Sequence, residues 1–156
     1  MKLVIQRVKS AEASVGGEVV GSCGKGLLML LGVADGDTKR DAEVLAQKVV
    51  KLRIFCDEAD KLNLSVMDID GEALIISNFT LLANYKKGNR PDYMGAARPD
   101  EARALYEYFV SLVRAELRQV GMGAFGEHME ISMTADGPIT ITMDSDVLLQ
   151  NKQKGL

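Results

Sequence analysis

The sequence predicts an α+β domain in which two main helices accompany a mostly antiparallel, barrel-like β-sheet. Three observations lead to this prediction. Short apolar or alternating runs, typical of strands, are separated by turns that contain glycine. Two longer segments, residues 38–52 and 99–120, repeat apolar side chains at spacings of three and four, as helices do. No internal repeat or linker interrupts the 156 residues, so we expect a single domain spanning residues 1–156.

The first part of the chain is predicted to consist of strands joined by tight turns. Apolar side chains in residues 3–8 surround Gln6 and Arg7, which indicates a strand with one polar or functional face. The pair Gly16-Gly17 lies between two strand-like segments and is a hairpin signal. After a second glycine-containing turn, the apolar run of residues 27–33 predicts a central strand.

Both helices are predicted from apolar periodicity. Residues 38–52 place apolar side chains on one face. A short strand, residues 52–55, and a polar connection, residues 57–70, are expected to follow. The second helix opens at Pro99, because proline suits a first helical turn. Its apolar stripe continues to Val120, after which glycines are expected to end the helix.

The most informative stretch combines a buried strand with polar groups at its end. The apolar run Ala73–Ile76 predicts a strand buried on both faces. It is followed at once by Ser77 and Asn78, and then by Phe79 and Thr80. Such polar groups are costly at the end of a buried strand unless they form hydrogen bonds. On composition alone, the simpler interpretation is that they bond to the backbone and close a turn.

The C-terminal part is predicted to form two strands and a tail. Residues 130–134 alternate as a strand, and residues 139–143 return as another. Asp136-Gly137-Pro138 is expected to make a sharp turn between them. Residues 147–156 have only weak patterning and are expected to form a tail.

Residues 84–91 predict a long polar and basic loop. It holds Lys86, Lys87 and Arg90, and a loop of this length is either functional or simply solvated. The net charge of the chain is −3, which argues against a protein that coats nucleic acid without specificity. It does not argue against a protein that contacts only the end of an RNA.

The residue types that metal and cofactor chemistry needs are sparse. His128 is the only histidine, and Cys23 and Cys56 form no CxxC pair. We expect no metal and no cofactor, since the sequence has no histidine cluster and no glycine-rich phosphate loop. We interpret His128 as an ordinary surface residue. The four aspartates between residues 57 and 70 are interpreted as solvated acids, because the pattern of an EF-hand is incomplete there.

The composition predicts a cytoplasmic protein with no membrane segment. Hydrophobic residues make up 47% of the chain and charged residues 26%, which is ordinary for a soluble globular protein. The apolar run of residues 27–31 is far shorter than the about 20 residues that a membrane helix needs. Residues 1–7 become polar too early for a signal peptide, and two cysteines without a disulfide framework suit a reducing compartment.

Two stretches together carry a resemblance to a known family. Residues 77–81, Ser-Asn-Phe-Thr-Leu, resemble the Ser-Gln-Phe-Thr-Leu motif of D-aminoacyl-tRNA deacylases. Residues 136–140, Asp-Gly-Pro-Ile-Thr, resemble that family's Asn-x-Gly-Pro-Val-Thr motif. Asn78 stands where the family usually has Gln, and Ala135 where it usually has Asn. The other stretches similar to the family are residues 1–8, 24–28, 52–55, 63–65 and 125–126.

The resemblance implies an enzyme that hydrolyses the ester between a D-amino acid and the 3′ end of tRNA. It would also accept glycine and reject L-aminoacyl-tRNA, which is chiral proofreading in translation. The catalytic residues would be Ser77, Phe79 and Thr80, with the backbone N–H groups of the last two stabilising the oxyanion. Thr80 is given a positioning role first and a nucleophilic role second, because the sequence shows no base beside it.

The resemblance also implies a homodimer with active sites at the subunit interface. Gly137-Pro138 would have a cis peptide bond, and its carbonyl groups would enter the partner's site and exclude an L side chain. Arg7 would brace this segment. The remaining implied substrate contacts are Asn78, Phe125, Gly126 and Met129. Because Lys86, Lys87 and Arg90 lie in the loop that follows this site, we also expect them to contact phosphates near the acceptor end of the tRNA.

Two other functions remain open at this point. The first is a non-catalytic dimer on the same fold that binds nucleic acid or protein. The second, weaker one is an esterase of small acyl compounds. The deacylase is favoured because a binding module would not need Ser77, Phe79, Thr80 and the Gly137-Pro138 pair together.

Overall fold

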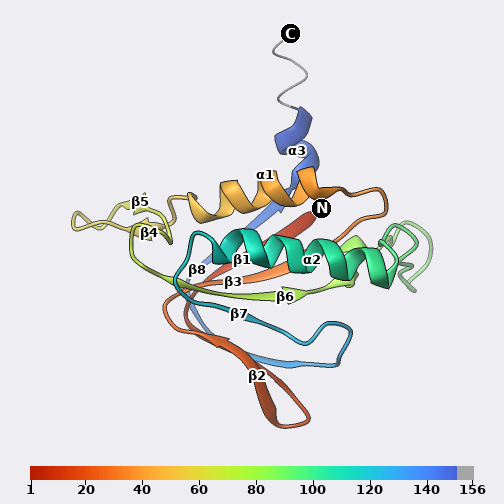
Figure 1. Cartoon of the computed structure of the whole chain (residues 1–156), viewed down its shortest axis with the longest axis horizontal. Coiled ribbons are helices and arrows are strands. Elements are labelled where there is room, and N and C mark those ends of the chain that lie inside the picture. The colour runs from red at the N-terminus through yellow and green to blue at the C-terminus, as the bar shows by residue number, and fades with distance from the viewer. Residues whose placement is uncertain (151–156) are drawn as a thin grey trace.

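The computed structural model describes residues 1–150 and combines a curved sheet with helices on one of its faces (Figure 1). The strands are β1 (Lys2–Val15), β2 (Glu18–Cys23), β3 (Gly26–Gly32), β4 (Phe55–Cys56), β5 (Leu62–Leu64), β6 (Glu72–Ser77), β7 (Val120–Met122) and β8 (Glu130–Asp144). The helices are α1 (Lys39–Val50), α2 (Pro99–Arg114) and α3 (Ser145–Gln150), with a 3₁₀ turn, η1 (Phe79–Leu82). The fold is therefore α+β, as the sequence predicted.

The main sheet is mixed and has six strands. Its order is β2-β1-β3-β6-β7, and β8 pairs with β1 on the other side. Strand β1 runs antiparallel to β2, β3 and β8, whereas β3 with β6 and β6 with β7 are parallel. The prediction of a mostly antiparallel sheet did not anticipate these two parallel pairings. Both connections that create them carry a helix, as parallel neighbours require.

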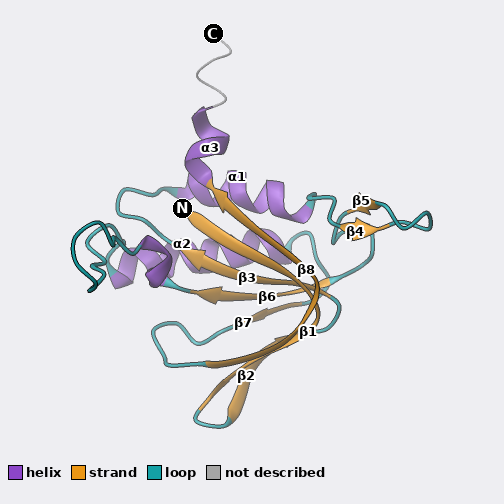
Figure 2. Ribbon diagram, turned by 180° about the vertical axis from the view of Figure 1, so that it is seen from behind, coloured by secondary structure: helices purple, strands orange, loops and turns teal. Residues whose placement is uncertain are grey.

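The sheet curls until β2 approaches β7, which makes it a nearly closed barrel (Figure 2). Glycine permits this approach on both strands. A Cβ atom on Gly21 would lie 2.0 Å from the carbonyl oxygen of Met122, and one on Gly121 would lie 2.5 Å from that of Ser22. Side chains at these two positions would push the strands apart.

Strand β6 lies at the centre of the core. Its residues Ala73–Ile76 are all buried, and β3 and β7 flank it on both edges. One face packs under the helices with Leu45 and Phe109, which belong to the same cluster as Ile75. Alternate residues, Leu74 and Ile76, face a second cluster inside the curved sheet. The prediction of a strand buried on both faces is confirmed.

Three predicted boundaries are wrong. The second helix ends at Arg114 rather than near Val120, and Val120–Met122 is a strand because its backbone pairs with β6. The short strand expected at residues 52–55 is Phe55–Cys56, which pairs with the unpredicted β5. The expected tail begins as α3, and its residues 151–156 lie outside the described part of the chain.

Strand β8 also differs from the prediction. The sequence predicted two strands joined by a sharp turn, but β8 continues through Asp136-Gly137-Pro138. Both halves pair with β1 in the same antiparallel sense, and the register shifts where Gln6 faces Thr140 and Val8 faces Ala135. The segment is thus a bulge, because extra residues on one strand oppose few on the other. The Gly137–Pro138 peptide bond is cis, as predicted.

Candidate active site

A cavity of about 840 Å³ opens beside the carboxyl end of β6. Its walls come from the ends of β3 and β6, η1, the segment before α2, the first turn of α2, and residues 125–131. The volume lies within the range of about 300–1,000 Å³ that small-molecule sites usually have. The cavity lining is mainly apolar, and Ser77, Asn78 and Thr80 supply polar groups where β6 ends. Of the residues predicted from sequence, Ser77, Asn78, Phe79, Thr80, Phe125, Gly126 and Met129 line this cavity.

The polar end of the cavity is organised by Asn78. Its side-chain oxygen accepts hydrogen bonds from the Thr80 backbone N–H, at 3.2 Å, and from the Thr80 hydroxyl. The Asn78 N–H in turn donates to the carbonyl of Leu31 at 2.8 Å, which attaches η1 to the end of β3. The asparagine therefore caps η1 through an Asx-type turn. An asparagine suits this task because its side chain is short.

The packing of η1 against β3 depends on a glycine. A Cβ atom on Gly32 would lie 2.6 Å from Leu82 Cδ2 and 3.0 Å from Leu81 Cβ. The missing side chain lets the 3₁₀ turn pack directly on the end of β3. Consequently Phe79 and Thr80 are held at the cavity although both are exposed, with Phe79 57% exposed.

The wall formed by Phe125 is supported from behind. Two side chains of α2 contact the Phe125 ring. The centroid of the Tyr106 ring lies 6.0 Å from that of Phe125, and the guanidinium carbon of Arg103 lies 5.3 Å from the Phe125 centroid. The Tyr106 hydroxyl donates to the carbonyl of Ile75 at 2.7 Å, so the same residue also bonds β6. Burial raises the pKa of Tyr106 to about 12, so the hydroxyl stays protonated as a donor.

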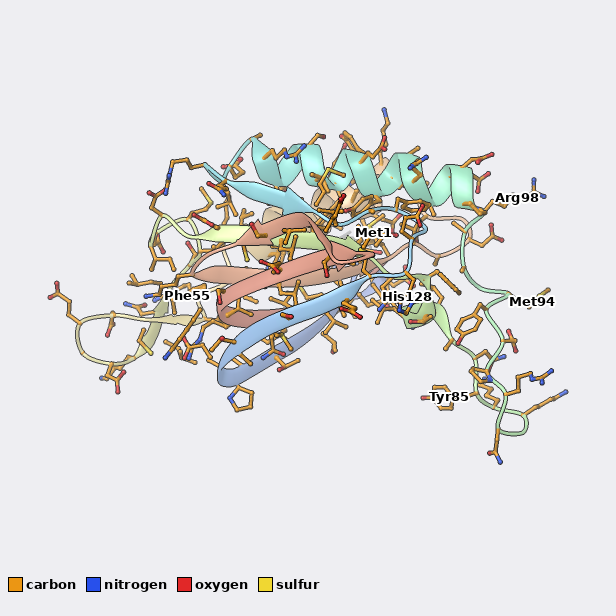
Figure 3. The ribbon with its side chains drawn as sticks, turned by 90° about the horizontal axis from the view of Figure 1, so that it is seen from below. Met1, Phe55, Tyr85, Met94, Arg98 and His128 are labelled. Carbon is orange, nitrogen blue, oxygen red and sulfur yellow. The ribbon has the colours of Figure 1, made fainter. Side chains whose placement is uncertain are left out.

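Several residues that line the cavity were not identified from the sequence. Tyr93 meets the Phe79 ring edge-on, with ring centroids 5.1 Å apart, and Arg98, Glu127 and His128 add charged or titratable groups. Figure 3 shows His128 close to the sheet, on the same side of the molecule as Arg98. His128 is exposed, as expected of a surface residue, but the surface it occupies is that of the cavity. The one sequence signal for this position is that His128 lies between Gly126 and Met129, which were both predicted to contact the substrate.

Arg7, Gly137 and Pro138 lie together, but they do not line the cavity. Arg7 is only 8% exposed. Its Nε donates to the Asp136 carbonyl at 3.1 Å and lies 3.3 Å from the Asp136 carboxylate, while Nη1 donates to the Ile54 carbonyl at 2.8 Å. Arg7 therefore ties the bulge of β8 to the segment before β4.

Lys86, Lys87 and Arg90 are exposed in the loop that follows η1 and lie outside the cavity. Elsewhere, two of the four aspartates that were expected to be solvated, Asp57 and Asp68, accept hydrogen bonds from backbone N–H groups in turns. Asp57 accepts from the backbone N–H groups of Ala59 and Lys61, and the pKa of its carboxyl is lowered by these bonds. Within residues 1–150 no group of three metal-ligating side chains is found, and no helix has the length and apolar character to cross a membrane.

A mainly apolar cavity with a few polar groups at the end of a buried strand is typical of an active site or binding site for a small molecule. The comparison with known proteins defines the family. The chain belongs to the D-Tyr-tRNA(Tyr) deacylase family, whose model matches residues 4–144. It is 50% identical over 145 residues to a protein from Caldicellulosiruptor saccharolyticus named D-aminoacyl-tRNA deacylase, covering 93% of this chain and 97% of that one.

Further comparisons agree with this family. A Bacillus licheniformis protein of the same name is 51% identical over 145 residues, covering 93% of this chain and 99% of the relative. Among solved structures, one titled c-Myc DNA Unwinding Element Binding Protein has a TM-score of 0.87 at 38% identity, covering 92% of this chain and 98% of that one. A probable eukaryotic D-amino acid tRNA deacylase shares the fold, with a TM-score of 0.80 at 17% identity over 92% of this chain and 98% of that one.

Proposed function

We propose that this chain hydrolyses the ester bond of D-aminoacyl-tRNA, and of glycyl-tRNA, and releases the free amino acid and tRNA. The observation that carries the proposal is that Ser77, Phe79 and Thr80 meet Phe125 and Met129 around one cavity of about 840 Å³. Relatives that are about half identical over nearly their whole length are named D-aminoacyl-tRNA deacylase. In this proposal the terminal adenosine and its aminoacyl group occupy the cavity.

The residues divide the chemistry between them. Phe125, supported by Tyr106 and Arg103, offers an aromatic face for the adenine, and Met129 completes that wall. The Phe79 N–H is the proposed main oxyanion donor. The Thr80 N–H is already bonded to Asn78, so it can contribute only by sharing that bond.

Water is the proposed nucleophile, helped by the 2′-hydroxyl of the RNA. Attack on the ester carbonyl gives a tetrahedral oxyanion, and its collapse expels the ribose oxygen, which takes up the proton lost by the water. Thr80 is a weak candidate for nucleophile because its hydroxyl donates to the neutral amide of Asn78, which cannot act as a base. The hydroxyl then serves to orient η1 or the substrate.

Chiral selection is proposed to need a second subunit. Gly137 and Pro138 lie outside this chain's cavity, so they can reach an aminoacyl group only in a partner's site. Their carbonyls would occupy the place of an L side chain, and Arg7 would fix them through Asp136. The open edge of β8 carries exposed Ile131 and Met133, which a symmetric dimer could bury.

Basic side chains outside the cavity are proposed to hold the acceptor end. Lys86, Lys87 and Arg90 would contact phosphates and supply affinity that does not depend on sequence. Replacing all three with alanine should weaken tRNA binding and flatten its dependence on salt. Unchanged affinity would leave the loop merely solvated.

The decisive assay compares matched D- and L-aminoacyl-tRNA and measures the amino acid released from each. We expect release from the D form and from glycyl-tRNA only. Ala102→Leu, which narrows the cavity from α2, should abolish release, whereas Ala104→Leu on the exposed face of the same helix should not. Sedimentation of the active protein as a monomer would contradict the dimer.

One observation favours a second function. The similar solved structure at 38% identity is titled as a DNA-binding protein. A non-catalytic nucleic-acid-binding dimer would bind tRNA without releasing amino acid from either form, so the same assay separates the two functions.

A further inference from the structure

Tyr85 is an aromatic side chain that the core and the cavity do not use. It is 80% exposed and lies in the loop between η1 and α2. Figure 3 shows Tyr85, Met94 and Arg98 along this segment, with Tyr85 farther from α2 than the other two. Single exposed aromatics are common on protein surfaces. The surroundings of this one give it a specific use.

The backbone around Tyr85 is held in place. Asn84 and Asp92 exchange two backbone hydrogen bonds, of 2.8 and 3.0 Å, which close the loop like a hairpin. The Asn84 side chain accepts from the Lys86 N–H at 3.2 Å, and the Asp92 side chain accepts from the Met94 N–H at the same distance. The loop therefore presents the Tyr85 ring to solvent from a fixed base, and little backbone freedom is lost when a partner binds.

The charge next to Tyr85 is positive. Lys86 and Lys87 follow it directly, and Arg90 lies in the same loop; all three are exposed. Within residues 1–150 none of the three forms an ion pair, so their charges are free for a ligand. An exposed ring beside several cations is the combination that single-stranded nucleic acid binds, through base stacking and phosphate contacts.

The loop is continuous with the cavity. Tyr93 and Met94, at its far end, line the cavity, and Tyr93 contacts the Phe79 ring. The other end of the loop begins directly after η1, which carries Phe79 and Thr80. A strand whose last nucleotide lies in the cavity would thus leave it along this loop.

We propose that Tyr85 stacks on an unpaired nucleotide that precedes the terminal adenosine of the RNA. This inference rests on the proposed function, because the adenosine in the cavity directs the strand toward the loop. Stacking uses the face of the base, so it adds affinity for any sequence in the unpaired end. It also selects RNAs whose 3′ end is single-stranded.

The experiment measures the affinity of uncharged tRNA with an intact 3′ end and of the same tRNA with its unpaired 3′ nucleotides removed. We expect the wild type to bind the intact tRNA more tightly than the trimmed tRNA. Tyr85→Phe keeps the aromatic ring and should show the same preference. Tyr85→Ala should weaken binding of the intact tRNA by about 5- to 150-fold, the loss expected for one base–aromatic stack, and leave the trimmed tRNA unaffected.

Equal binding of intact tRNA by Tyr85→Ala and the wild type would overturn the inference. So would an equal loss for both tRNAs with an altered sedimentation coefficient, because Tyr85 would then lie in a contact between protein subunits. Hydrolysis is measured separately on D-aminoacyl-tRNA. A protein that binds the intact end through Tyr85 but releases no amino acid would refute the proposed function and leave this inference standing.

Discussion

One sequence motif of this protein begins at the last residue of β6 and the other lies within β8, and the surroundings of the two strands are opposite. Residues 73–76 of β6 are buried, and β6 has a parallel neighbour on each edge. The 15 residues of β8 include none that is fully buried, and β8 pairs only with β1. The end of β6 forms part of the cavity, whereas the bulge of β8 lies away from it.

This contrast shows how the two halves of the proposed site are held. The core of a single chain fixes Ser77 and Phe79, because β6 cannot move without disturbing both hydrophobic clusters. The Gly137-Pro138 segment has no such core around it. Its support within the chain is mainly Arg7, and we propose that its complete setting requires the second subunit.

A matched pair of truncations tests the comparison most strongly. Ile75→Ala on β6 should lower the free energy of unfolding by about 2–5 kcal/mol, because it removes a fully buried side chain. Ile131→Ala on β8, where the side chain is 42% exposed, should change it by about 0.5 kcal/mol or less in the monomer. Urea denaturation at several protein concentrations measures both.

The concentration dependence sharpens this test. A larger cost for Ile131→Ala that grows with protein concentration would show that a second copy buries β8. Costs that are equal for both variants at every concentration would contradict the difference between the strands.

The next largest effect is expected at Arg7. Arg7→Met keeps the apolar stem but removes the donors to the Ile54 carbonyl and to Asp136, so unfolding should become easier by about 1–3 kcal/mol. Arg7→Lys should recover part of this, because an ammonium group cannot reproduce the fork of a guanidinium. Chemical denaturation measures the free energy of unfolding of the wild type and the two variants, and so ranks their stability. A Met variant as stable as the wild type would show that β8 needs no brace.

Tyr106 tests the link between β6 and the cavity wall. Tyr106→Phe removes the 2.7 Å hydrogen bond to the buried Ile75 carbonyl, which keeps its second donor, the Gly123 N–H at 3.1 Å. We therefore expect the free energy of unfolding to fall by about 1 kcal/mol, the net value of one hydrogen bond. Tyr108→Phe is the matched control, because the Tyr108 hydroxyl donates to the Glu43 carboxylate of α1. This variant should lose less stability than Tyr106→Phe. Thermal unfolding of the two variants in the same buffer measures both losses of stability. If the two losses are equal, the hydrogen bond from Tyr106 to β6 contributes no more than a surface hydrogen bond.

The smallest effect is expected at Thr80. Thr80→Ala keeps the backbone N–H and removes one hydroxyl hydrogen bond, so turnover of D-aminoacyl-tRNA should fall by about 2- to 12-fold. Thr80→Ser should be nearly unchanged. Single-turnover kinetics measure the chemical step. Complete loss of activity in a folded Thr80→Ala protein, with an acyl-enzyme trapped in the wild type, would make Thr80 the nucleophile.

Local sequence determined much of the fold. The Gly16-Gly17 pair predicted the hairpin between β1 and β2, and both glycines have positive φ values, of 57° and 85°, as that turn requires. The apolar run 73–76 predicted β6, and the simplest interpretation of the polar residues after it, a turn closed by their hydrogen bonds, matches the capping of η1 by Asn78. These features depend on neighbours in the chain, so their patterns could be read directly from the sequence.

Only the tertiary structure decided how distant segments meet. Val120–Met122 reads as the end of a helix, but parallel pairing with β6 makes it a strand, and the contact of Gly121 with β2 nearly closes the barrel. Residues 136–138 read as a turn, but pairing with β1 on both sides makes them a bulge. Hydrogen bonds between strands far apart in sequence fix these outcomes, and no local pattern encodes which strands will pair.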